Sequence, residues 1–156
     1  MRTSAFKQVD VFTAVALMGN PLAVVFDADD LSPTDMQRIA AWTNLSETSF
    51  VLAPTQPTAD YRVRIFTPCN ELPFAGHPSV GTLHALIEGE RIAAKDRFIQ
   101  ECAAGLLPMR IEHAAVGRRI FIRAPRATIG DADAATAAAA QAALGTSVRA
   151  ARAADN

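Results

Sequence analysis

The chain has 156 residues, of which 50% are hydrophobic and 20% charged, and its formal net charge is −1. This composition is typical of a globular protein with a core of its own. It argues against a basic nucleic-acid-binding protein, because the 15 lysines and arginines are balanced by 16 acidic residues. No apolar run approaches the roughly 20 residues of a membrane-spanning helix, so neither nucleic acid nor a membrane is an expected partner.

The N-terminus and the cysteines bear on the cellular compartment. The stretch MRTSAFKQVDVF lacks the apolar segment of a signal peptide, so we expect a cytoplasmic protein. The two cysteines, Cys69 and Cys102, are too few for a disulfide framework and lack the spacing of zinc ligands. We therefore expect free thiols and no metal site.

The first part of the chain predicts strands separated by a turn, a helix and a polar loop. Strands are expected at residues 7–12, 22–27, 48–53 and 61–66. Between the first two strands, MGNP at 18–21 predicts a turn in which Gly19 and Asn20 adopt unusual φ values.

A helix is predicted to begin after Ser32. Ser32 can cap it, a proline fits its first position, and Asp35 follows three residues after the cap. Met36, Ile39 and Ala40 then fall on one helical face, which we expect to be buried.

A second helix is predicted from about Pro78 to Glu88. Its buried stripe is expected to comprise Val80, Leu83, Leu86 and Ile87. The strands RFIQEC, LLPMRIE and RRIFIR follow, and the first two are joined by a turn whose length suits a hairpin. The order ββαββαβββ has few crossovers long enough for a parallel sheet, which favours an α+β fold with antiparallel strands packed on one or two helices.

The composition changes at about Ala127. DADAATAAAAQAALG has high helix propensity but almost no large apolar side chain to dock it, and the residues after Gly145 are expected to be frayed or disordered. We therefore predict one domain at residues 1–126 and an alanine-rich tail at 127–156 that begins an incomplete second unit.

The stretch ELPFAGHPSVG, residues 71–81, places Gly76 and His77 where a strand gives way to a helix. The first N–H groups of a helix have no partner within it and, with the helix dipole, favour an anion such as a carboxylate. Gly76 lets a ligand approach closely, and His77 could relay a proton or hydrogen-bond a substrate. The alternative is that Gly-His-Pro is an ordinary way to enter a helix.

The stretch NLSETSF, residues 44–50, places Glu47 between apolar neighbours at the start of a strand. A carboxyl group in such a position could transfer protons, and Ser46 could donate a hydrogen bond to a substrate carboxylate. The alternative is that these polar residues end the preceding helix and face water.

Taken together, GNPLAVVFDADDLS, NLSETSFVL, RIFTPCNELPFAGHPSVG and ECAAGLLPMRI resemble the PhzF-like family of phenazine-biosynthesis-type isomerases. The resemblance runs from Val9 to about Pro125. That family's fold is similar to that of diaminopimelate epimerase, in which two halves each wrap a mixed sheet around a central helix and the active site lies between them. The resemblance implies that this chain is one such half, with a mostly antiparallel sheet, and that the helix from Pro78 is its central helix.

The resemblance also implies roles for the residues of the two polar stretches. Glu47 matches the family's acid/base glutamate, and His77 with Gly76 matches the active-site histidine and the amides that receive a substrate carboxylate. Ser46 matches a substrate-binding position. The family is cofactor-independent and moves a proton on a small cyclic or amino-acid-like carboxylate, so we expect an isomerase or epimerase of this kind, without a cofactor and dimeric.

A runner-up is a thiol-type amino-acid racemase or epimerase. Related racemases carry a catalytic cysteine just before the central helix, where this chain has Ala75. Without that thiol such a mechanism lacks an acid on this half. Cys69 is expected to be a spectator and Cys102 to lie in the core.

The other conspicuous residues are expected to be structural. His84 is two helical turns from His77, too far to share a metal, and is expected to pack or lie at the surface. His113 is expected to be solvated. Trp42 and the phenylalanines are expected to lie in the core.

The sequence departs from the family in one respect. Members carry a second half that supplies another catalytic carboxylate, an aspartate, whereas Asp131, Asp133 and Asp155 of the tail lie in no matching motif. An isolated half would expose an apolar surface that favours association. The chain could thus work as a homodimer or with a partner that supplies the second half, or be a catalytically inactive binding or self-associating module.

Overall fold

The computed structural model describes residues 3–115, 117–147 and 152–155. The chain forms two compact units, Met1–Ala124 and Pro125–Asn156. The division lies two residues before the 126/127 boundary expected from the composition.

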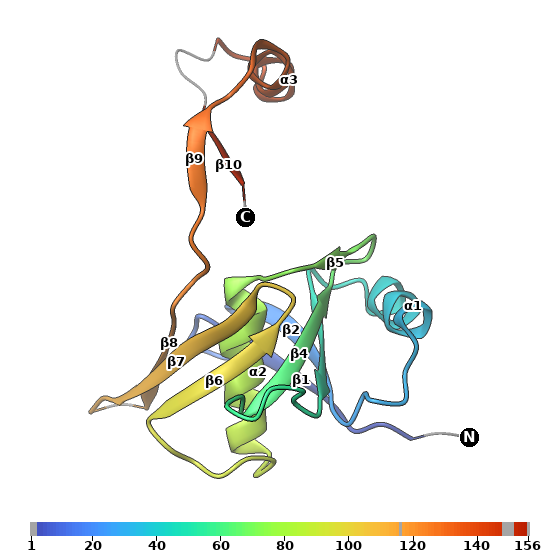
Figure 1. The fold of residues 1–156 in the computed structure, drawn as a ribbon, viewed down its shortest axis with the longest axis vertical. Helices are drawn as coiled ribbons and strands as arrows, with labels where there is room; N and C mark the ends of the chain where they lie inside the picture. The colour runs from blue at the N-terminus through green and yellow to red at the C-terminus, as the bar shows by residue number, and fades with distance from the viewer. Residues whose placement is uncertain (1–2, 116, 148–151, 156) are drawn as a thin grey trace. The chain divides into compact units, whose positions relative to one another are not determined.

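Unit 1 is built on an eight-stranded mixed sheet and two helices (Figure 1). The strands are β1 (Phe6–Val11), β2 (Asn20–Val25), β3 (Thr48–Leu52), β4 (Tyr61–Phe66), β5 (Glu71–Leu72), β6 (Arg97–Cys102), β7 (Gly105–His113) and β8 (Arg118–Ile122). Their order is β1-β2-β3-β4-β6-β7-β8, and β5 adds to the end of β4. Among the strand pairs that the structure describes in this sheet, β2–β3 and β4–β6 are parallel and the others are antiparallel. The predicted α+β fold with a mixed, mostly antiparallel sheet is confirmed.

The helix α2 (Gly76–Glu88) lies within the curl of this sheet (Figure 1). It contacts strands as far apart in the sheet order as β1 and β8. The predicted stripe is right for Leu83 and Leu86 and wrong for Val80 and Ile87, which are only half-buried. The stripe is also too narrow, because Pro78, Ser79, Gly81, Thr82 and Ala85 are buried as well. A helix wrapped on several sides buries more than one stripe, which makes α2 the central helix of the unit.

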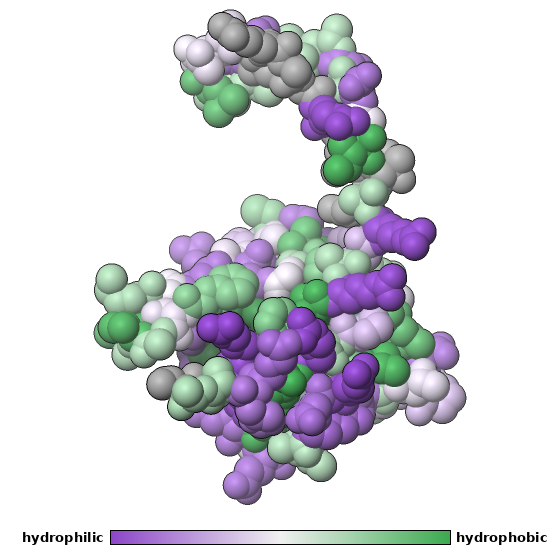
Figure 2. Space-filling model, turned by 90° about the vertical axis from the view of Figure 1, so that its left-hand side faces the viewer, coloured by the Kyte–Doolittle hydropathy of each residue, from purple (hydrophilic) through white to green (hydrophobic). Residues whose placement is uncertain are grey.

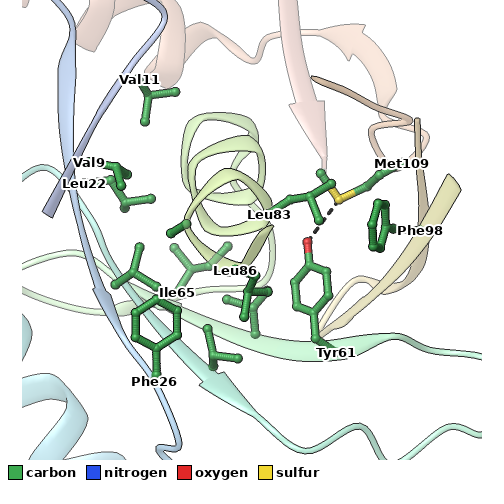
Figure 3. Packing of buried hydrophobic residues seen from close by; sticks show 14 of the residues in the cluster. Val9, Val11, Leu22, Phe26, Tyr61, Ile65, Leu83, Leu86, Phe98 and Met109 are labelled. Carbon is green, nitrogen blue, oxygen red and sulfur yellow. Dashed lines mark hydrogen bonds between the residues drawn. The ribbon is translucent and has the colours of Figure 1, made fainter. Parts of the chain in front are cut away.

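The main core forms between α2 and the inner face of the sheet (Figure 3). Leu83 and Leu86 of the helix meet Leu22, Ile65 and their neighbours from the strands. Some buried polar groups in this core are paired, whereas the hydroxyl of Thr82 on α2 has no hydrogen-bond partner among the described residues. The hydroxyl of Tyr61 lies 3.1 Å from both Gln100 Oε1 and Met109 Sδ, and Gln100 donates to Ser79 Oγ at 2.9 Å.

Gly81 sets how closely α2 approaches the sheet. A Cβ atom at this position would lie 2.6 Å from Leu22 Cδ2 and 2.8 Å from Val11 Cγ2. Both distances are well inside van der Waals contact, and Leu22 is fully buried. Glycine is therefore required here by space.

The helix α1 (Pro33–Thr43) packs against the outer side of the sheet. Ser32 caps it as predicted, accepting a hydrogen bond from the Asp35 N–H at 3.1 Å. Met36 and Ala40 are buried as predicted, whereas Ile39 is only half-buried. Trp42 is 84% exposed, so its expected place in the core is wrong. Trp42 follows Ala40 by two residues, about 200° around the helix, and so points away from the buried face.

The turn before β2 differs from the expectation. Gly19 and Asn20 do not have positive φ values; Phe12 (φ 65°) and Leu17 (φ 67°) do. Residues 12–18, which include both, are mostly exposed and apolar, and the exposed fraction of Phe12 is 74%. Phe6 is also exposed, at 55%, so the phenylalanines are not all in the core.

A chain of polar contacts links the two outer strands through α2. Lys7 of β1 pairs with Glu88 at 2.8 Å, Glu88 lies 3.3 Å from His84 Nε2, and Arg118 of β8 lies 3.1 Å from His84 Nδ1. Since a guanidinium only donates, Nδ1 accepts, and Nε2–H donates to Glu88. Burial and the nearby Arg118 charge lower the pKa of His84.

Unit 2 contains β9 (Thr128–Asp131), α3 (Ala134–Leu144) and β10 (Arg152–Asp155). Asp133 caps α3 by accepting the Thr136 N–H at 2.7 Å, and α3 has no buried residue. Residues 152–155 pair antiparallel with β9, so the expectation of disorder is wrong there, because strand pairing needs only backbone groups. Residues 148–151 and 156 lie outside the described residues. In the described part of the chain, no helix is both long and apolar enough to cross a membrane.

Replacing Gly81 by valine should lower the free energy of unfolding by about 1–3 kcal/mol, the usual cost of overpacking a core. Chemical denaturation would measure the change. Gly76→Val is the matched control, since a Cβ at Gly76 meets nothing within 4 Å. Equal losses in both variants would contradict the steric role of Gly81.

The stability of unit 1 should fall as the pH is lowered from about 7 to about 5.5. The folded pKa of His84 is below its ordinary value of 6.5, so the unfolded chain binds this proton first and acid favours unfolding. His84→Gln should flatten this dependence in denaturant titrations at several pH values. His113→Gln, which alters an exposed histidine, should leave it unchanged; an unaltered slope in His84→Gln would refute the assignment.

Candidate functional site

Two of the predicted site residues meet at the N-terminus of α2. Glu47 directly precedes β3, and His77 lies in the first turn of α2. Their side chains form a hydrogen bond of 3.0 Å between His77 Nδ1 and Glu47 Oε2. The His77 side chain is only 10% exposed and that of Glu47 20%, so the pair is shielded but open to a ligand on one side.

The backbone fixes where the protons of this pair lie. His77 Nε2 is 3.0 Å from the carbonyl oxygen of Asn20. A carbonyl only accepts, so Nε2 must carry a hydrogen. The contact between Nδ1 and Glu47 then holds one further proton, either on the carboxyl or on an imidazolium. That proton can leave and still yield an ordinary neutral imidazole and a carboxylate.

The start of α2 offers backbone donors beside this pair. Ala75 is the N-cap residue and provides no side-chain cap. Within the helix the N–H groups of Gly76 and His77 have no acceptor, Pro78 has no N–H, and the first helical bond runs from Ser79 N to Ala75 O at 3.2 Å. The space around Gly76 is open. Two amides and the positive end of the helix dipole are therefore accessible to an anion.

Ser46 lies next to the pair but does not touch it. Its side chain is exposed, and its Oγ is 3.4 Å from Asn20 Oδ1. Asn20 thus contacts both Ser46 and His77. Asn20 was expected only as a turn residue; it is the first residue of β2, and no sequence signal marks the contact of its carbonyl with His77.

Phe12 is a second neighbour that sequence reasoning missed. Its ring centroid is 5.9 Å from that of His77, with the ring planes tilted by 46°. Residues 12–18 add further exposed apolar side chains, those of Val15, Leu17 and Met18. One flank of the pair is therefore apolar, although the phenylalanine had been assigned to the core.

A hollow of about 930 Å³ lies along α2 between β1 and β8 and reaches Phe12, but neither Glu47 nor His77 lines it. Its lining includes His84, Glu88 and Arg118 of the polar chain between the outer strands. The face of unit 1 turned to the viewer in Figure 2 carries a hydrophilic area with separate apolar patches around it. Proton-transfer chemistry is better served by the shielded pair at the helix start than by this open, solvated hollow.

The remaining candidates do not join the site. Both cysteines are free; Cys69 is exposed and Cys102 is half-buried in β6, where burial raises the pKa of its thiol. His84 belongs to the polar chain, and His113 is exposed beside Asp96 at 3.3 Å. Within residues 3–115, 117–147 and 152–155, no three histidine, cysteine or acidic side chains cluster as metal ligands would.

The sequence matches a known family over nearly its whole length. The family model described as "Phenazine biosynthesis-like protein" matches residues 9–155. The Schizosaccharomyces pombe protein "Antisense-enhancing sequence 1" is 54% identical over 113 residues, which are 72% of this chain and 38% of that protein. The trans-2,3-dihydro-3-hydroxyanthranilate isomerase of Pseudomonas aeruginosa is 53% identical over 104 residues, covering 67% of this chain and 36% of the isomerase.

Solved structures give the same result. A PhzF-family phenazine biosynthesis protein from Bacillus anthracis is 39% identical, with a TM-score of 0.71 over 81% of this chain and 43% of that one. A predicted epimerase from Pseudomonas aeruginosa is 32% identical, with a TM-score of 0.77 over 93% of this chain and 51% of that one. A hydroxyproline epimerase from Agrobacterium vitis, 16% identical with a TM-score of 0.60, shares the fold.

The chain spans less than half the length of the curated relatives above. The matched region nevertheless includes both polar stretches and all of unit 1 from Val9 onward. The resemblance seen in the sequence is thus confirmed: the chain belongs to the phenazine biosynthesis-like (PhzF) family, whose curated members include named isomerases.

Proposed function

We propose that this chain supplies one wall of an isomerase that moves a proton on a small carboxylate substrate, with Glu47 as the acid/base and His77 as its partner. The observation that carries the proposal is the 3.0 Å contact between these side chains, with the Asn20 carbonyl on the other ring nitrogen. It rests also on the named activity of the relatives, the isomerisation of trans-2,3-dihydro-3-hydroxyanthranilate.

In this proposal, Glu47 and His77 transfer a proton because their contact holds one proton that can leave. Glu47 as carboxylic acid delivers the shared proton to a substrate carbon and becomes a carboxylate. Its lone pairs then face the lone pair of His77 Nδ1, and this repulsion makes the pair a base for the proton that leaves another carbon. One proton leaves and one arrives, so the reaction needs no net oxidant or reductant, and we propose that it uses no cofactor.

The substrate carboxylate is proposed to bind at the start of α2. The N–H groups of Gly76 and His77 would donate to it, and Ser46, on the exposed side, would add a hydroxyl. This would place the rest of a small cyclic or amino-acid-like substrate beside Glu47 and against the apolar flank at Phe12. Charge-assisted hydrogen bonds to backbone amides are strong enough to orient it.

A second wall is needed to enclose the substrate and to supply another acid/base group. We propose that it comes from a second half of the protein or from a partner chain, with a homodimer as the expected assembly. The exposed apolar residues 12–18, next to the site, suit such a contact. A cytoplasmic location is proposed because both thiols are free.

The thiol-type racemase is the weaker candidate. It needs a thiol at the start of the central helix, and Ala75 occupies the N-cap position there. Neither cysteine belongs to the first turn of α2. Burial also raises the pKa of Cys102 and so disfavours the reactive thiolate.

Replacing Glu47 by glutamine should lower turnover by at least about a hundredfold, since the amide cannot exchange the shared proton. The assay follows deuterium incorporation into trans-2,3-dihydro-3-hydroxyanthranilate in D₂O by NMR. It uses this chain alone and a chimera in which the chain replaces the matching segment of the Pseudomonas aeruginosa isomerase.

Glu112→Gln, which changes an exposed glutamate on β7, is the matched control and should keep full turnover. Unreduced deuterium incorporation in the Glu47→Gln chimera would refute the assigned role. A chimera that folds yet shows no incorporation even with Glu47 would favour the inactive-module hypothesis.

Replacing Gly76 by alanine should weaken substrate binding by roughly tenfold to a hundredfold while leaving stability unchanged. The added methyl group meets no protein atom within 4 Å, but it occupies the space through which a carboxylate reaches the amides; losing such a hydrogen bond costs about 1.5–3 kcal/mol. KM of the chimera and its thermal unfolding would test this. An unchanged KM would contradict the carboxylate site.

A further inference from the structure

His77 bonds to the carbonyl of Asn20, and the residue before Asn20, Gly19, is held by a side-chain hydrogen bond to Asp10. This contact between Asp10 and Gly19 is the clamp. Asp10 of β1 accepts a hydrogen bond from the Gly19 N–H through Oδ2 at 3.2 Å. This contact closes the base of residues 12–18, and Val11 and Asn20 lie opposite each other in the β1–β2 ladder. The carboxylate therefore joins the end of β1 to the residue just before Asn20.

Gly19 packs closely against Asp10 and the residues around it. A Cβ atom on Gly19 would lie 2.3 Å from the Val11 carbonyl oxygen, 2.5 Å from Asp10 Oδ1 and 2.6 Å from Thr13 Cγ2. One of these atoms is backbone and cannot move aside. Any side chain at position 19 would therefore clash with its neighbours, whether or not the hydrogen bond forms. The close contacts and the hydrogen bond both place Asp10 against the backbone of Gly19.

Asn20 connects the contact between Asp10 and Gly19 to the candidate site. Its carbonyl accepts from His77 Nε2, and its side-chain oxygen lies 3.4 Å from Ser46 Oγ. The carbonyl keeps the hydrogen on Nε2, which allows the proton shared with Glu47 to leave. If Nε2 lost its hydrogen, releasing that proton would produce an imidazolate, which is far too basic near neutral pH.

We propose that Asp10 is a positioning residue for the acid/base pair: by clamping Gly19 it fixes the Asn20 carbonyl, and the carbonyl fixes the orientation and tautomer of His77. Asp10 acts only through this chain of contacts and touches no substrate. The inference deepens the proposed function of His77, but its test reads the histidine directly and does not depend on catalysis.

The test is NMR of the chain labelled with ¹⁵N-histidine, which contains three histidines. In the wild type, the Nε2–H proton of His77 should be visible and slow to exchange with water, because it is bonded and the ring is largely buried. Asp10→Ala should accelerate this exchange at least about tenfold. Asp10→Asn keeps an oxygen acceptor for Gly19 and should stay within about threefold of wild type.

Asp29→Ala is the control, because Asp29 likewise accepts one backbone N–H, that of Ala53, at 2.9 Å, although Asp29 is exposed and Asp10 is half-buried. It should leave the His77 proton unchanged. Backbone amide exchange of Val24 in the core reports global stability in the same samples and should not change in Asp10→Ala. Faster exchange that is confined to the His77 Nε2–H proton supports the positioning role of Asp10.

Three results would overturn the proposal: unchanged His77 exchange in Asp10→Ala, equal acceleration in Asp29→Ala, or parallel acceleration at Val24. If Asp10→Ala does not fold, Asp10→Gln replaces it, since the longer side chain keeps the acceptor but displaces it; the same tenfold criterion applies. Should Asp10 meet these criteria while Glu47→Gln retains turnover, the clamp would stand and the proposed function would fall.

Discussion

The burial of α2 inside the curled sheet is the constraint on which the rest of unit 1 depends. Its buried positions lie on several sides of the helix, and Gly81 allows contact with Leu22 and Val11 that no larger residue permits. A helix held in this way cannot slide or rotate without opening cavities in a close-packed core. Its N-terminus is consequently a fixed point, and that is where the candidate site forms.

Three segments that are distant in sequence meet at this fixed point. In the parallel pairing of β2 with β3, Ala23 lies opposite Thr48, so Asn20 at the start of β2 and Glu47 just before β3 lie at the same end of the two strands. Asn20 and Glu47 therefore both reach His77, one through a carbonyl and the other through a carboxyl. The chemistry of the pair follows from this geometry, because the carbonyl dictates which ring nitrogen carries the hydrogen.

The site combines a rigid polar corner, formed by Glu47, His77 and the Asn20 carbonyl, with an exposed apolar flank, formed by residues 12–18. The corner is held by hydrogen bonds to backbone groups and by the close packing at Gly19, whereas residues 12–18 present large apolar side chains to solvent. Isolated exposed apolar residues are ordinary, but here several follow one another beside the shielded Glu47–His77 pair. This combination accords with a family whose curated relatives are more than twice as long as the matched region.

The sequence by itself determined the α+β class and the capped start of α1 at Ser32, and it singled out Glu47 and His77, which lie 3.0 Å apart, because period, capping and motif are local properties. It could not show that Asn20 holds His77, since a backbone carbonyl has no signature in the sequence. It also misplaced Trp42 and Phe12, because exposure depends on which side of an element meets the sheet. The exposure of Trp42 depends on which side of α1 packs on the sheet. The meeting of Asn20, Glu47 and His77 was decided only by the wrapping of the sheet around α2, since this wrapping fixes which distant segments share the start of that helix.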